Sequence, residues 1–203
     1  MNNLKVYIFL ALLTPLLWWT LFQLPSIFNE WKKTPHYFIT QTKSFLTPEK
    51  LKFQEDLRWE SEKHSNPLGR FFYNKSTSLM DEFFSAVSFL SPRIYFQAGD
   101  GNKLSPNVVE PTLIILFPLW IFGLISLVEA RRFKPILLWL GFGVFAFLLG
   151  QKNFYFTLPI VFLNIFFITY FINKLKAKTK YLILSVVLIY GSYILGRAIW
   201  MIH

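Results

Sequence analysis

The chain has no cysteine, and outside residues 29–110 its only acidic residue is Glu129. The absence of cysteine excludes disulfides, thiolate metal sites, a cysteine nucleophile and lipoprotein acylation. The three histidines, His36, His64 and His203, are scattered, and neither a His-Glu-x-x-His nor a Gly-x-Ser-x-Gly motif occurs. We therefore predict neither a metal site nor a cofactor.

Positive charge is distributed unevenly along the chain. Residues 29–110 hold eleven Lys or Arg and ten Asp or Glu, whereas the remainder holds ten and one. Seven of these cations lie in two short links: Arg131, Arg132, Lys134, Lys174, Lys176, Lys178 and Lys180. A nucleic-acid site would gather cations on one folded face with stacking aromatic residues, whereas these cations flank apolar segments. The net charge of +10 therefore indicates membrane topology, and nucleic acid is not an expected partner.

Hydrophobic residues make up 54% of the chain and aromatic residues 20%, above the usual share in soluble domains. A helix needs about 20 residues to cross the hydrocarbon core of a bilayer. Five apolar stretches approach this length: Val6–Phe28, Pro111–Val128, Pro135–Gly150, Phe154–Ile172 and Tyr181–Trp200. The sequence thus predicts an all-α, polytopic integral membrane protein with about five transmembrane helices and a helical extracytoplasmic loop subdomain.

The positive-inside rule orients these spans, because the two basic links and the Lys5 end belong on the cytoplasmic side. Residues 1–28 form an N-terminal transmembrane anchor, since the first stretch is too long for a signal peptide. Residues 29–110 form the extracytoplasmic loop, and residues 111–203 form a four-helix transmembrane region. We predict a multi-pass protein of the inner or plasma membrane, with a cytoplasmic N-terminus and an extracytoplasmic C-terminus.

Two helices are expected in the long loop. Thr47-Pro48-Glu49 is a helix start signal, and that helix runs to about His64. A second helix begins at Ser78, carries apolar residues at helical spacing and ends before Pro92. Its aromatic face lies along the outer membrane surface or packs on the spans.

Polar and small residues in the spans give two packing expectations. Asn164 is expected to make an interhelical hydrogen bond. The pairs Ala146 with Gly150 and Ser192 with Gly196 lie four residues apart, so each pair occupies one helix face. They either permit close backbone approach or are chance features of apolar segments.

The most distinctive segment, residues 89–102, has the pattern Phe-x-Ser-Pro-x-x-x-Phe-x-x-Gly-Asp-x-Asn. It precedes a proline-containing stretch and an apolar span that ends in basic residues. From Phe72 to Gly150 the chain resembles the later part of bacterial GT-C superfamily membrane glycosyltransferases, of the kind related to protein O-mannosyltransferases and lipid A aminoarabinose transferases.

The GT-C resemblance implies a link to lipid-carried sugars. The family takes a sugar from a polyprenyl-phosphate carrier at the outer membrane face, and a carboxylate in its first external loop acts as base. This chain has about five spans where the family has eleven or more, and no acidic motif matches the catalytic one. The resemblance therefore implies a truncated relative of the non-catalytic half.

Three functions remain open from the sequence. The first is a non-catalytic or partnered protein of an envelope lipid-linked sugar pathway, which binds polyprenyl-phosphate or a larger membrane enzyme. The second is a compact glycosyltransferase that uses Glu30 or Asp100 as its catalytic carboxylate. The alternative is that Glu30 is an ordinary solvated interface charge, because no neighbour in the sequence tunes its proton affinity, and that Asp100 is a turn residue before Gly101. The third is a membrane adaptor whose loop binds another envelope protein.

A lipid-phosphate site is predicted at the outer leaflet. In the expected topology Arg93, Lys152 and Arg197 all lie near that leaflet. Cations of this kind hold a phosphate group, and arginine does so with two parallel hydrogen bonds. The alternative is that all three are separate interface charges that extend toward water.

Overall fold

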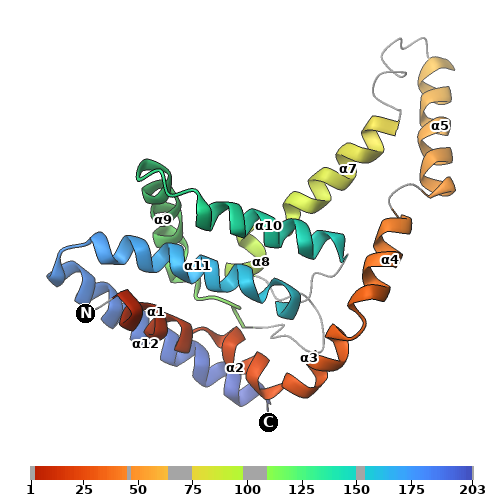
Figure 1. The fold of residues 1–203 in the computed structure, drawn as a ribbon. Coiled ribbons are helices and arrows are strands. Elements are labelled where there is room, and N and C mark those ends of the chain that lie inside the picture. Colours follow the sequence, from red (N-terminus) through yellow and green to blue (C-terminus); the bar gives the residue numbers. More distant parts are fainter. Residues whose placement is uncertain (1–2, 45–46, 64–74, 98–108, 150–153, 203) are drawn as a thin grey trace.

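The computed structural model describes residues 3–44, 47–63, 75–97, 109–149 and 154–202, and these form helices and no strands (Figure 1). The helices are α1 (Asn3–Leu12), α2 (Pro15–Phe22), α3 (Leu24–Trp31), α4 (Thr34–Ser44), α5 (Pro48–Lys63), α7 (Lys75–Ser88), α8 (Pro92–Phe96), the short 3₁₀ helix η1 (Ile114–Leu116), α9 (Phe117–Glu129), α10 (Lys134–Leu148), α11 (Phe154–Lys174) and α12 (Ala177–Ile202). The all-helical class is confirmed, and the last four apolar stretches correspond to α9–α12.

Helix α11 lies at the centre of the bundle, where it packs against α1, α9 and α10 (Figure 1). Ile160, Ile165, Phe167 and Ile168 of this helix have no exposed surface. A helix that is apolar and covered on most of its sides belongs in a core. The other apolar helices surround it, so that α11 organises the bundle.

Asn164 is the polar centre of this core. Its Oδ1 accepts hydrogen bonds from the indole N–H groups of Trp120 on α9 (2.8 Å) and Trp139 on α10 (3.0 Å). One side chain thus joins three helices, and the interhelical hydrogen bond expected for Asn164 is confirmed.

The closest backbone approach lies at Gly123 of α9, not at the small-residue pairs expected from the sequence. A Cβ atom at Gly123 would overlap the backbone carbonyl of Phe167 on α11. At Gly196, by contrast, a Cβ atom would meet nothing within 4 Å, and Ser192 is exposed as well. The Ser192–Gly196 expectation is therefore wrong; of the other pair, Ala146 is buried and Gly150 lies outside the described residues.

The first apolar stretch forms three short helices and not the single span expected over Val6–Phe28. The chain bends by 64° between α1 and α2, and it breaks again at Gln23 before α3. Pro15 causes the first break, because proline lacks an N–H and disfavours helical geometry in the preceding residue. Thr14 accordingly has an extended conformation, with φ −80° and ψ 115°.

Backbone groups at this bend have partners. The Thr14 hydroxyl donates a hydrogen bond to the carbonyl of Leu10 (2.9 Å). The N–H of Leu16 donates to the carbonyl of Pro111 (3.3 Å), at the start of the second apolar stretch. A broken helix is tolerated inside an apolar bundle when such partners satisfy its backbone.

Helices α4, α5 and α7 form an arm that extends away from the bundle (Figure 1). Helix α5 confirms the first loop helix, and the Lys50 N–H donates to the Thr47 hydroxyl (3.3 Å) at its start. Helix α7 confirms the second, although it begins at Lys75, before the expected Ser78. Helix α4 was not expected, and α3 was expected only in part, as the end of the single span over Val6–Phe28.

The arm joins the bundle where α7 meets α10. Leu90, just beyond α7, fills the space over Gly143, where a Cβ atom would overlap its side chain. Phe89 packs edge-on against Phe147, with ring centroids 6.1 Å apart. The segment after α7 therefore packs on the bundle, whereas Phe83 and Phe84 of α7 are exposed.

Helix α9 ends in a tight turn of the Schellman type. The N–H of Arg132 donates to the carbonyl of Leu127, and the N–H of Arg131 to that of Val128, both at 2.9 Å. Arg131 has a φ of 54°, the left-handed conformation in which helices usually place glycine. A side chain in this conformation costs about 1–2 kcal/mol.

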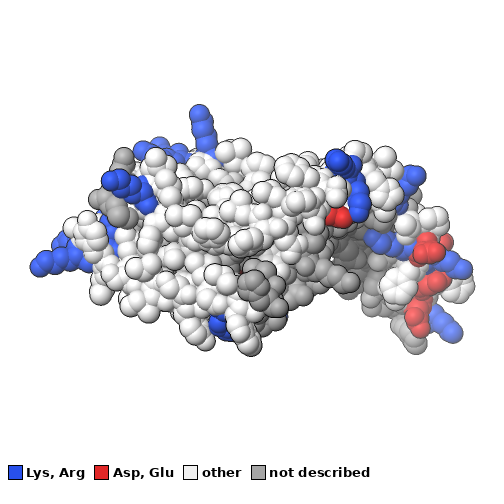
Figure 2. Space-filling view, turned by 90° about the horizontal axis from the view of Figure 1, so that it is seen from below, with Lys and Arg blue, Asp and Glu red and all other residues white. Residues whose placement is uncertain are grey.

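The α9–α10 and α11–α12 turns lie at the same end of the bundle as the N-terminus (Figure 1). In Figure 2 the Lys and Arg side chains at that end have no acidic side chain beside them in view, whereas toward the opposite end basic and acidic side chains lie together. We call Arg131, Arg132, Lys134 and Lys174 the basic end. The structure thus brings together the two basic links that the charge pattern assigns to one side.

By length and hydropathy, one helix in the described ranges can cross a membrane unaided, over Ala177–Trp200 of α12. The bent pair α1 and α2 makes a second span if it is counted as one. The remaining apolar helices are shorter, over Ile114–Glu129, Lys134–Leu148 and Leu158–Lys174. Of the five expected spans, one therefore meets the length criterion alone, and the other four are bent or short.

Candidate functional site

An apolar groove of about 660 Å³ lies beside α11, bounded by α1, α10 and the α3–α4 turn. We call it the α11 groove. Its aromatic lining residues are Tyr7, Trp31, Phe145, Phe156 and Phe162, and Thr34, Leu158 and Pro159 complete it. Its size falls within the usual range of small-molecule sites, and its lining suits an apolar chain.

Pro159 and Tyr7 shape the middle of the α11 groove. Pro159 lies inside α11 and removes one backbone hydrogen bond from the helix. The Tyr7 hydroxyl of α1 donates to the carbonyl of Phe162, one turn further along (3.4 Å). The polar atoms of the wall are thereby turned toward protein groups, and carbon atoms face the groove.

A charged cluster lies at the mouth of the α11 groove. Lys33 Nζ donates to Oε1 of Glu30 (2.7 Å), and the Tyr37 hydroxyl donates to Oε2 (2.5 Å). The Tyr37 ring packs edge-on against Phe156 of the groove wall, with centroids 6.1 Å apart. This contact connects the cluster to the groove.

The cluster holds Glu30 in its charged form. The hydrogen bond from Lys33 and, next, that from Tyr37 lower the pKa of Glu30 below its ordinary value of 4.5. The same bonds raise the pKa of Lys33 and of Tyr37. Both carboxylate oxygens of Glu30 are occupied, and a carboxylate whose charged form is stabilised is a weak proton acceptor at neutral pH. This geometry suits a fixed polar anchor better than a catalytic base.

The sequence offered a signal for this cluster that was missed. Lys33 and Tyr37 follow Glu30 at intervals of three and seven residues, which place side chains on one helix face. Because the helix was expected to end at Phe28 and α4 was not expected, the three residues were not placed together.

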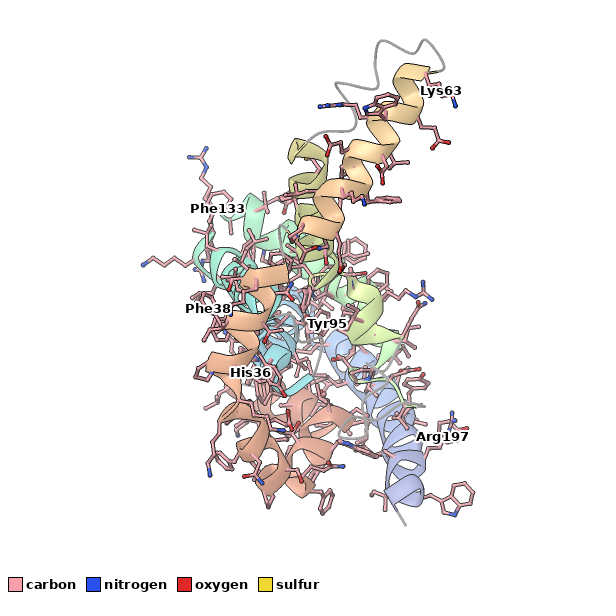
Figure 3. The ribbon with its side chains drawn as sticks, turned by 90° about the vertical axis from the view of Figure 1, so that its right-hand side faces the viewer. His36, Phe38, Lys63, Tyr95, Phe133 and Arg197 are labelled. Atoms are coloured by element: carbon pink, nitrogen blue, oxygen red, sulfur yellow. The ribbon has the colours of Figure 1, made fainter. Side chains whose placement is uncertain are left out.

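The predicted lipid-phosphate residues are only partly described. Arg93 is exposed on α8, beside a small pocket of about 290 Å³ that also includes Phe96 and Ile114. Arg197 is exposed on α12, on the far side of the molecule from His36 of α4 (Figure 3). Lys152 and the catalytic candidate Asp100 lie outside the described residues. The three-cation site stays a prediction.

Glu110 is a second polar anchor that sequence reasoning missed. Its Oε2 accepts from the N–H of Ile114 (2.7 Å), which caps η1, and its Oε1 accepts from the Tyr190 hydroxyl of α12 (2.6 Å). An acid at the start of an apolar helix is a recognised capping signal. Arg197 lies seven residues after Tyr190, on the same face of α12.

Comparisons of the chain with known proteins found no relative that has this site. No protein-family model, no curated protein and no solved structure matches the chain.

Proposed function

We propose that this chain is a multi-spanning membrane protein. The observation that carries the proposal is the apolar surface around the bundle, where large side chains are exposed on α10 and α12. They include Leu137 (63%), Leu182 (67%) and Ile189 (73%). Monomeric soluble proteins rarely expose contiguous apolar surface of this kind. Hydrocarbon would cover these faces, while the polar contacts of Asn164 stay inside.

The proposed orientation places the basic end in the cytoplasm and the arm outside. Because the chain has no cysteine, every introduced cysteine is a unique label site. Glu55→Cys on α5 and Lys178→Cys on α12 both lie at exposed positions. An impermeant maleimide is expected to label Glu55→Cys in intact cells and Lys178→Cys only in inverted vesicles. The reverse pattern would overturn the orientation, and labelling of both in intact cells would overturn the membrane-spanning architecture.

We further propose that the α11 groove holds the apolar chain of a membrane lipid, with the Glu30 cluster at the headgroup level. The groove is apolar along its wall and charged at its mouth, which matches the two parts of a lipid. Following the GT-C resemblance, polyprenyl-phosphate is the lipid to test, and the protein serves an envelope lipid-linked sugar pathway as a non-catalytic partner. The exposed Phe53 and Trp59 of the arm offer a surface to the partner enzyme.

The groove is tested with Leu158→Trp, which places a larger ring in it. Displacing two lipid methylenes, at about 0.8 kcal/mol each, lowers affinity about tenfold. Retention of added polyprenyl phosphate is measured by native mass spectrometry of the detergent-purified protein. The matched control, Leu182→Trp, makes the same change on the exposed face of α12. Equal retention by both variants would overturn the lipid role of the groove.

A further inference from the structure

The basic end contains a preformed arrangement of cations around one aromatic ring. Arg132, after α9, and Lys174, at the end of α11, both lie against the Tyr170 ring, at 5.7 and 4.9 Å from its centroid. Lys174 Nζ also donates to the carbonyl of Ser126 (3.5 Å). No ion pair joins Arg132, Lys134 or Lys174 to a carboxylate of the described chain. Both cations are thus held against the same ring, and neither has a carboxylate partner among the described residues.

Arg131 adds a second, independent observation. It occupies the left-handed position of the α9 turn, where glycine would be favoured. Membrane topology requires only that this link be positively charged. Arg132 and Lys134 already provide that charge, and neither has a positive φ. Strained positions of this kind cluster at ligand-binding sites. The turn itself accounts for the left-handed backbone, but it does not require an arginine side chain at this position.

An apolar groove begins at the same place. It has a volume of about 610 Å³ and runs along α10 from Lys134 past Leu137, Leu138, Gly141 and Phe142 to Phe145. We call it the α10 groove. A Cβ atom at Gly141 would meet nothing within 4 Å, so the groove floor is open there. One end of this groove is cationic and the rest is apolar.

We propose that the basic end and the α10 groove together bind one anionic phospholipid. Its phosphate lies among Arg131, Arg132 and Lys134, and one acyl chain lies along α10. Charge complementarity selects this occupant, because the cations lack an anion and arginine pairs bidentately with phosphate. The inference rests on the proposed membrane position of the chain. It concerns a second groove, which shares Phe145 with the α11 groove, and the opposite leaflet in the proposed topology.

The test measures lipid retention in detergent by native mass spectrometry, with phosphatidylglycerol and phosphatidylcholine as probes. Wild-type protein is expected to retain phosphatidylglycerol preferentially. Arg131→Gly and Lys134→Gln each remove one cation, which lowers phosphatidylglycerol affinity about fivefold. Gly141→Leu fills the α10 groove and leaves every charged residue unchanged. It is expected to reduce phosphatidylglycerol retention as strongly as the removal of one cation. Lys178→Gln is the matched control, since it removes an exposed cation of the α11–α12 link that does not line the groove.

Arg131→Gly also separates binding from folding. Glycine relaxes the left-handed turn, so the melting temperature is expected to rise while phosphatidylglycerol retention falls. If Lys178→Gln lost as much phosphatidylglycerol retention as Lys134→Gln, retention would depend only on the net charge of the protein, and the proposed site would be overturned. Equal retention of the two lipids by wild-type protein would also overturn it. Lipid retention is measured in detergent and does not depend on orientation in the membrane. A reversed topology would therefore contradict the proposed orientation without affecting the test of the phospholipid site.

Discussion

Gly123→Ala is expected to lower the free energy of unfolding by about 1–3 kcal/mol, the usual cost of overpacking a core. The added Cβ atom would overlap the carbonyl carbon and oxygen of Phe167, which belong to the α11 backbone. Backbone atoms have no rotamer to change, so α9 and α11 must separate. Gly123→Leu is expected to cost more, because a larger group enters the same contact. Thermal unfolding in detergent, followed by circular dichroism, measures both.

Gly141→Ala is the matched control for this prediction, because it adds the same methyl group to α10 where no atom lies within 4 Å. In a helix interior this change is expected to stabilise by about 0.5–1 kcal/mol, since alanine loses less entropy on folding than glycine. The two alanine variants should therefore shift the melting temperature in opposite directions. A Gly123→Ala protein as stable as wild type would contradict the close approach of α9 and α11.

Asn164→Leu is expected to destabilise the bundle by about 2 kcal/mol. It removes the acceptor shared by the indoles of Trp120 and Trp139, and both N–H groups lose their partner at once. Interhelical hydrogen bonds inside membranes contribute about 0.6–1.7 kcal/mol each, similar to their net value in water, because the unfolded chain in the membrane also finds partners. Two such bonds give the expected total. Tryptophan fluorescence reports the change directly, because both donors are indoles.

The control for this prediction is Ser185→Leu, a polar-to-apolar change at an exposed position of α12, which is expected to be near neutral. A double-mutant cycle with Trp139→Phe isolates one of the two bonds. If Asn164→Leu cost no more in the wild-type background than in the Trp139→Phe background, that bond would contribute nothing.

The sequence predicted the helices that are determined by residues within or next to them. α5 follows from a capping threonine and a proline at its first turn, and α9–α12 follow from apolar length alone. α3 was expected only as the end of one continuous span, and α4 was missed, because it lies where the apolar anchor was expected to give way to a loop. The hydrogen bond from Leu16 to Pro111 at the Pro15 bend could not be predicted, because Pro111 is remote in sequence and no local pattern indicates the contact.

The candidate site was less predictable than the fold. Glu30 was selected from the sequence, but its partners Lys33 and Tyr37 depend on how α3 passes into α4. The α11 groove gathers residues from four separate helices or turns, and nothing in one stretch of sequence places Tyr7 opposite Phe156. Contact between α9 and α11 likewise requires that Gly123 face Phe167, and small-residue spacing alone did not single out that glycine.

The hydrogen bond between Leu16 and Pro111 has a consequence for biosynthesis. A nascent chain exposes residue 16 long before residue 111 leaves the ribosome, so the N–H of Leu16 lacks its Pro111 partner during early synthesis. If the chain spans the membrane as we propose, that unsatisfied amide would be costly in hydrocarbon. In that proposed topology the N-terminal segment would reach its final bent form late, after the segment that begins at Pro111 has been made.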